Sequence, residues 1–225
     1  PKPTDRVIHV DEKLSYAHST STEKHYIISN TNEMLDEMAA KYPNQTCFIF
    51  ANNQKLTFGD VRNRTRIIAQ NLLHMGFKKG DFLGIAVDNS YQTVILFLAC
   101  ASIGVVSVLL NEKYKVFEFE HLLKKTNAKG LFIRDEKDGK NYLDIIRKIC
   151  PDFDDEANNV KGDLKLANLP ELRHIITLSA SGKSSFAGCW NFDELHDNRM
   201  SQSDHEWPNV DMDDKLMIVF TVCFT

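Results

Sequence analysis

Strand-like and helix-like stretches alternate along the middle of this chain at a spacing that few folds can accommodate. Short apolar runs predict strands at 82–87, 105–110, 130–133 and 174–178, while patterns with a helical period predict helices at 116–126 and 142–150. Neighbouring parallel strands need a long crossover between them, and that crossover is usually a helix. The sequence therefore predicts an α/β fold with a layered, mostly parallel sheet and flanking helices.

Local signals predict where the earlier elements begin and end. Thr57-Phe58-Gly59-Asp60 fits a capping box for a helix that runs to Met75, and Gly76 supplies a stop. Asp60 is therefore interpreted as a capping residue and not as a catalytic one. Asn30 or Thr31 is expected to cap a helix through residue 40, and 46–50 and 55–57 are expected to form a hairpin.

One uncharged stretch, from Asn89 to Asn111, is about as long as a membrane span. Gly104 divides it into a part with helical spacing and a β-branched run at 105–108, and basic flanks are missing. We expect a helix, a tight turn and a buried strand in place of a transmembrane segment. Asp88, Asn89 and Ser90 are the candidate caps of that helix.

Two polar segments, Asp152–Leu169 and Ser179–Gly188, interrupt the alternation and are predicted to be surface loops. An apolar run from Leu216 to Thr221 predicts a last strand. A parallel sheet that ends on such a strand would expose an edge and leave one layer uncovered.

Composition argues against several classes of function. The formal charge of −4 arises from 27 basic and 31 acidic residues that are interspersed, so no basic face for nucleic acid is expected. The five cysteines lie too far apart for the usual metal or redox motifs and are expected to be reduced. No metal site is predicted.

Familiar catalytic motifs are missing or incomplete. Gly182-Lys183-Ser184 resembles the end of a P-loop, but Thr177 stands where the first glycine is required. No Gly-x-Ser-x-Gly elbow occurs. His74, His121 and His174 are expected to be merely exposed or packed, and Glu118, His121 and Lys125 are expected to form the solvated face of one helix.

A series of motifs in fixed order does carry information. The series resembles the opening of the AMP-forming acyl-CoA synthetases, the luciferase-like adenylating family. Within it, the runs 14–18, 142–151 and 169–172 are most similar to a branch that acts on medium-chain acids in mitochondria. The motifs are Leu56-Thr57-Phe58-Gly59-Asp60-Val61, Gly76-Phe77-Lys78-Lys79-Gly80-Asp81, Asn89-Ser90-Tyr91, Gly104 and Asn111-Glu112-Lys113-Tyr114.

The resemblance implies a fatty-acid CoA ligase that forms an acyl-adenylate from ATP with Mg²⁺ and passes the acyl group to coenzyme A. It implies a mitochondrial location, with a cytoplasmic one as the alternative, because no leader is visible. Residues 1–30 are polar, mixed in charge and without a sustained period, and are expected to form an extended arm. The resemblance implies that 31–221 form part of an adenylation domain and that 222–225 are a divergent tail. Asp88 departs from a proline that is common in the family, and Leu109-Leu110 precede Asn111 where another proline is common.

The end of the matched region limits what the resemblance can transfer. Family members continue a strand ending in Phe-Thr with a Ser-Gly-Thr-Thr-Gly phosphate-binding loop. Met217 to Thr221 match the strand, whereas Val222-Cys223-Phe224-Thr225 do not match the loop. Thr221 is the one residue carried over as cofactor-binding, and no catalytic or metal-binding residue is. We therefore expect this chain alone to be inactive and to bind none of the cofactors tightly. The alternative is a non-catalytic short product that acts as a binding or interaction module.

Overall fold

A six-stranded sheet forms the centre of the computed structural model, which describes residues 8–11, 16–19, 29–137, 139–155, 162–179, 186, 188–196 and 206–220. The strand order is β11–β10–β7–β5–β6–β12, and every neighbouring pair is parallel. This confirms the predicted parallel sheet. The strands are β5 (Phe82–Ala86), β6 (Val106–Leu109), β7 (Gly130–Arg134), β10 (His174–Leu178), β11 (Trp190–Asn191) and β12 (Met217–Val219).

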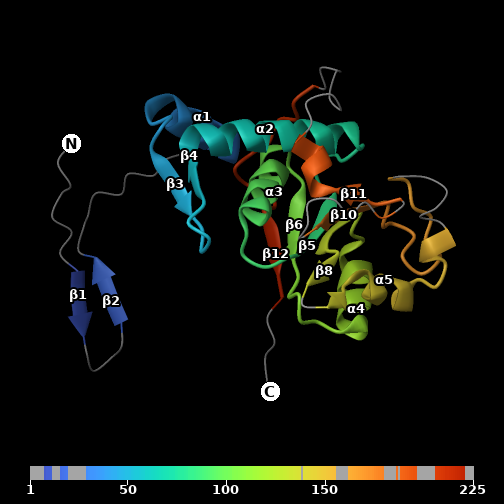
Figure 1. The fold of residues 1–225 in the computed structure, drawn as a ribbon. Helices are drawn as coiled ribbons and strands as arrows, with labels where there is room; N and C mark the ends of the chain where they lie inside the picture. Colours follow the sequence, from blue (N-terminus) through green and yellow to red (C-terminus); the bar gives the residue numbers. More distant parts are fainter. Residues whose placement is uncertain are drawn as a thin grey trace.

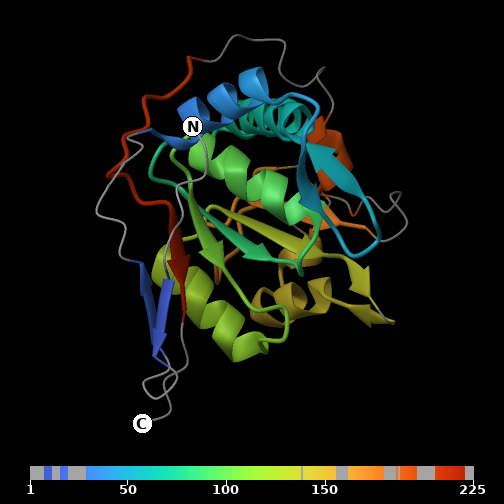
Figure 2. The same ribbon diagram turned by 90° about the vertical axis from the view of Figure 1, so that its left-hand side faces the viewer.

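Helices cover both faces of this sheet (Figures 1 and 2). One face carries α1 (Thr31–Lys41), α2 (Phe58–His74) and α3 (Tyr91–Ser102), and the other carries α4 (Val116–Thr126) and α5 (Leu143–Ile149). The chain moves from β5 to β6 through α3, and then returns across β5 to β7 through α4. Crossovers between parallel strands are right-handed as a rule, so this reversal of direction along the sheet places α4 on the face opposite α3.

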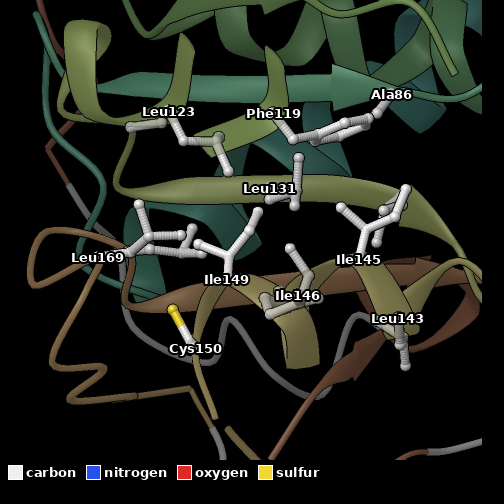
Figure 3. Packing of buried hydrophobic residues seen from close by; sticks show 14 of the residues in the cluster. Ala86, Phe119, Leu123, Leu131, Leu143, Ile145, Ile146, Ile149, Cys150 and Leu169 are labelled. Atoms are coloured by element: carbon white, nitrogen blue, oxygen red, sulfur yellow. The ribbon is translucent and has the colours of Figure 1, made fainter. Parts of the chain in front are cut away.

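Alternate side chains of each strand enter two separate cores. On β7, Leu131 and Ile133 pack with α4 and α5, whereas Phe132 packs with the α2 and α3 side chains. Figure 3 shows Phe119 of α4 and Ile146 of α5 on either side of Leu131. Each fully buried large apolar side chain contributes about 1.5–3 kcal/mol. This burial on both faces explains why the strands read as continuous apolar runs.

The capping signals in the sequence are confirmed. The Thr57 hydroxyl accepts a hydrogen bond from the Asp60 backbone amide at 3.1 Å, and the Asp60 carboxylate accepts one from the Thr57 amide at 2.9 Å. Asn30 caps α1 with Glu33 in the same reciprocal way. Gly76 has φ of 86°, which explains the stop after α2. β3 (Thr46–Ile49) and β4 (Lys55–Thr57) form the predicted antiparallel hairpin.

Three further structures were not expected from the sequence. β1 (Ile8–Asp11) and β2 (Tyr16–Ser19) pair antiparallel within what we expected to be an extended arm. β8 (Glu136–Lys137) and β9 (Lys140–Asn141) form a second small hairpin, and a 3-10 helix, η1 (Phe192–His196), follows β11. All three are too short to show a hydrophobic period.

The prediction of a surface loop at 152–169 is wrong for its described ends. Phe153, Leu164, Leu166 and Leu169 are buried in the core beneath α5. Exposed residues alternate with Leu164 and Leu166, so this segment packs one side against the core and presents the other to solvent. Most of the other predicted loop, 179–188, lies outside the described residues.

The uncharged stretch is divided as expected. α3 has only 12 residues, and Gly104 then turns the chain with φ of 71° into β6. Among the described residues, no helix combines the length and apolar character that crossing a membrane requires.

Candidate functional site

The carboxyl ends of the parallel strands meet at one edge of the sheet. Both Val219 of β12 and Ile85 of β5 pair with Leu109 of β6, and Leu178 of β10 pairs with Arg134 of β7. Ligands of open parallel sheets bind at this edge, where the loops from neighbouring strands leave toward opposite faces. β5 continues to α3 on one face, while β6 and β7 continue to α4 and α5 on the other. The edge beside β5 is therefore the candidate site.

A charge pair bridges β5 and β7 at this edge. Arg134 ends β7 and donates a hydrogen bond from Nη2 to Oδ1 of Asp88, which lies two residues past β5. The Arg134 side chain is 13% exposed, and that of Asp88 is 34% exposed. Nε of Arg134 is buried and has no hydrogen-bond partner among the described residues. The pair neutralises a largely buried cation.

Hydrogen bonds fix the loop between β5 and α3. The Ser90 hydroxyl accepts from the Thr93 amide at 3.3 Å, and the Thr93 hydroxyl donates to the Asp88 carbonyl at 2.9 Å. Ser90 is thus the cap of α3 among the three predicted candidates. The same bonds hold Asp88 in place beside Arg134.

A hollow of about 250 Å³ lies between this loop and the turn of the β3–β4 hairpin. The Phe50 and Tyr91 rings meet there edge to face at 6.4 Å, and the Arg64 guanidinium lies 5.5 Å from the centre of the Tyr91 ring. The described residues that line this hollow combine aromatic rings with carboxamides and include no charged side chain. The carboxamides belong to Asn52, Gln54, Asn89 and Gln92.

The loop after β6 also reaches this edge. The Asn111 carboxamide oxygen accepts from the Lys113 amide at 2.9 Å, and the Glu118 carboxylate accepts from the Lys115 amide at 3.0 Å. Glu118 therefore helps to start α4, in addition to lying on its polar face as predicted. His121 is exposed and stacks on Phe117, in agreement with the expected solvated face.

Thr221, the one site residue carried over from the resemblance, lies outside the described residues. The described chain ends beside it at Phe220, which packs against the core on the α4 side. The parallel register of β12 with β6 directs the chain toward the carboxyl edge. The role of Thr221 stays a prediction.

Titratable groups elsewhere have structural surroundings. Burial lowers the pKa of His174 to about 4 and raises that of the Cys100 thiol to about 12. The four cysteines that the structure describes are free, and Cys223 lies outside the described residues. No group of three or more His, Cys, Asp or Glu in the described part of the chain could hold a metal ion. Gly182-Lys183-Ser184 lies outside the described residues.

The sequence did not reveal the charge pair. Asp88 and Arg134 lie 46 residues apart, and a single arginine at the end of a strand carries no recognisable pattern. The available signal was that both residues follow predicted strands immediately. Without the sheet order, however, nothing indicated that β5 and β7 are neighbours.

Comparisons with known proteins agree with this architecture. The family model described as AMP-binding enzyme matches residues 35–222. The chain is 31% identical over 168 residues to the mitochondrial medium-chain acyl-CoA ligase ACSF2 of Rattus norvegicus, covering 74% of this chain and 27% of that protein. It is 28% identical to the putative acyl-CoA synthetase YngI of Bacillus subtilis, covering 75% of this chain and 30% of that protein. The chain thus spans less than a third of the length of these relatives.

Solved structures share the fold. Acetoacetyl-CoA synthetase from Streptomyces lividans superposes with a TM-score of 0.65 at 19% identity, covering 86% of this chain and 28% of that one. The anthranilate CoA ligase AuaEII, solved with anthranoyl-AMP, superposes with a TM-score of 0.61 at 21% identity, covering 84% and 30%. The parallel sheet, the ordered motifs and the family match over 35–222 agree, and the chain belongs to the AMP-binding enzyme family.

Proposed function

We propose that this chain forms part of an adenylating acyl-CoA ligase that acts on medium-chain fatty acids in mitochondria. In the whole enzyme, the acid's carboxylate attacks the α-phosphorus of ATP and releases pyrophosphate. The thiol of coenzyme A then attacks the acyl carbon and releases AMP. The observation that carries the proposal is β12. By the resemblance, β12 corresponds to the strand that precedes the phosphate-binding loop in family members, and it ends at the same edge of the sheet as Asp88 and Arg134.

The described residues contribute to this reaction by positioning. β6 pairs with β12, while the loops after β5, β6 and β7 form the polar rim beside the carboxyl end of β12. The triphosphate requires preorganised donors at that end. ATP, Mg²⁺ and coenzyme A are the cofactors that the family uses. Residues beyond the described ones would bind them.

A chimera tests the proposal. Residues 31–221 of this chain would replace the matching segment of the rat medium-chain acyl-CoA ligase, and exchange between ATP and labelled pyrophosphate would be measured with octanoate. We expect octanoate-dependent exchange from the chimera and none from residues 1–225 alone. A chimera that is folded by circular dichroism but shows no exchange would refute the proposal. The unmodified rat ligase is the positive control.

A second candidate, a non-catalytic interaction module, is favoured by one observation. β12 lies at the end of the sheet order among the described strands, and Leu216, Met217 and Val219 beside or within it are 43%, 47% and 55% exposed. Exposed apolar edge strands pair readily with other chains. Light scattering of the purified chain tests this candidate. A monodisperse species that binds a partner would support it, whereas progressive aggregation would contradict it.

A further inference from the structure

β12 has few attachments of its own. It has three residues, and in the described sheet its only strand neighbour is β6, with Met217 paired to Ser107 and Val219 paired to Leu109. The Ser107 amide also donates to the Leu216 carbonyl at 3.1 Å. Met217 and Val219 are about half exposed, whereas Ile218 is partly buried and Phe220, just after the strand, packs against the core. With only one strand neighbour in the described sheet, β12 leaves room for contacts outside the sheet to contribute to its register.

The segment that leads into β12, residues 206–216, is held by Lys79, which lies in the turn before β5. We call this segment the strap. The Lys79 Nζ atom lies 2.5 Å from Oδ2 of Asp214 and donates to the Asn209 carbonyl at 3.1 Å. The Asn30 carboxamide donates to the Val210 carbonyl at 3.3 Å and provides a second attachment.

Lys79 is itself fixed at its base. The Gly80 amide donates to the Gly104 carbonyl at 2.8 Å, and a Cβ atom on Gly104 would lie 2.8 Å from Cγ of Lys79. The lysine stem therefore packs against the backbone at Gly104, immediately before β6. This contact places its ammonium group at a defined distance from the strap.

Three aspartates, at positions 211, 213 and 214, lie in the turn of the strap. The Lys79 ammonium group therefore also reduces the repulsion among their negative charges. Oδ2 of Asp214 accepts from the Asp211 amide at 2.6 Å, and the Asp211 carboxylate accepts from the Asp213 amide at 3.1 Å. The hydrogen bond from Lys79 is the main cause of a lowered pKa at Asp214. Lys215 is the other charged residue that lines the hollow shared by Lys79, Asp213 and Asp214.

We infer that Lys79 is a positioning residue whose pairing with Asp214 latches the strap and holds β12 in register beside β6. The two residues come from different motif regions, the Lys-Gly-Asp turn before β5 and the acidic turn before β12. A slip of one residue would turn every side chain of β12 to the opposite face. That the register of β12 matters for nucleotide binding at the carboxyl edge rests on the proposed function. The latch itself can be measured without any nucleotide.

Hydrogen–deuterium exchange on the 225-residue chain tests the latch. An exposed ion pair and one hydrogen bond contribute little to global stability but act directly on this segment. We expect Lys79→Ala and Asp214→Asn to accelerate exchange in peptides covering 215–220 by roughly two- to ten-fold. Peptides from β5 and β7 should be unchanged. Lys79→Arg should retain the protection, and Lys78→Ala, at the neighbouring exposed lysine, should have no effect.

Charge reversal distinguishes a latch from ordinary packing. The double variant Lys79→Asp with Asp214→Lys should recover part of the protection that each single reversal loses, because the two charges are again opposite. Recovery is partial because Asp at position 79 cannot donate to the Asn209 carbonyl and Lys at position 214 cannot accept from the Asp211 amide. The inference is overturned if Lys79→Ala leaves exchange at 215–220 unchanged, if it accelerates exchange equally in β7, or if the double reversal is no better protected than either single reversal. Loss of adenylation by the chimera would refute the proposed function but would leave these exchange rates as they are.

Discussion

Acidification should destabilise this chain through His174. The side chain is buried at the start of β10, and its ring lies 5.2 Å from that of Phe77. Burial is the main cause of its low pKa of about 4, and the charge of Lys129 adds to it. In the unfolded chain the histidine pKa is about 6.5. The unfolded state therefore takes up a proton first as the pH falls. The contribution of His174 to stability is complete above pH 6.5 and is lost between about pH 6.5 and 4, reaching about 2.5 kcal/mol at pH 4.5.

Urea unfolding followed by circular dichroism between pH 7.5 and 4.5 measures this loss. His174→Leu removes the titrating group and keeps a buried apolar side chain, so the variant should lose about 2.5 kcal/mol less than the wild type over that interval. Both proteins contain the same carboxylates, so comparing their two plots of stability against pH cancels the contribution of those carboxylates. They include Asp81 and Asp163, whose charges raise the pKa of His174 and so oppose the effect of burial. His121→Leu, at an exposed histidine outside the core, is the matched control substitution. Equal slopes for wild type and His174→Leu would refute the reasoning.

Three substitutions test other parts of the fold by the same unfolding measurement. Asp88→Asn leaves the Arg134 guanidinium without its counter-charge and should cost about 1–3 kcal/mol, a cost that Arg134→Leu in the same chain should largely remove. Thr57→Ala deletes the α2 cap and should cost about 1 kcal/mol. Gly130→Ala would place a Cβ atom 2.6 Å from Cζ of Phe77 and should cost about 1–3 kcal/mol. Substitutions without effect would contradict the corresponding contact.

Elements with a strong local signal could be predicted from the sequence. The expected bounds of α4 and β10 agree with the structure, and those of α2 differ by one residue at the end. In these elements the hydrophobic period and the caps indicate the same structure. The buried strands were recognisable because both of their faces are apolar, and Gly104 marked the turn before β6.

Features that depend on tertiary pairing could not be predicted in the same way. β12 lies beside β6 although more than a hundred residues separate them, and no local pattern specifies that pairing. The Asp88–Arg134 pair exists only because the crossover through α4 returns the chain to the other side of β5. The buried Leu164 and Leu166 were missed because the acidic residues around them made the whole segment resemble a surface loop.

The structure also explains why the family motifs were weak separately and informative together. Thr57–Asp60, Lys79–Asp81, Asn89–Tyr91 and Gly104 all lie where the chain passes between a helix and a strand. Each therefore encodes a cap or a turn that many proteins use, and only their spacing encodes one sheet. Asp88 departs from a family proline, and here its carboxylate has a specific partner in Arg134. The Asp88 carboxylate therefore adds a charge pair at the carboxyl edge of the sheet, beside the loop that leads into α3.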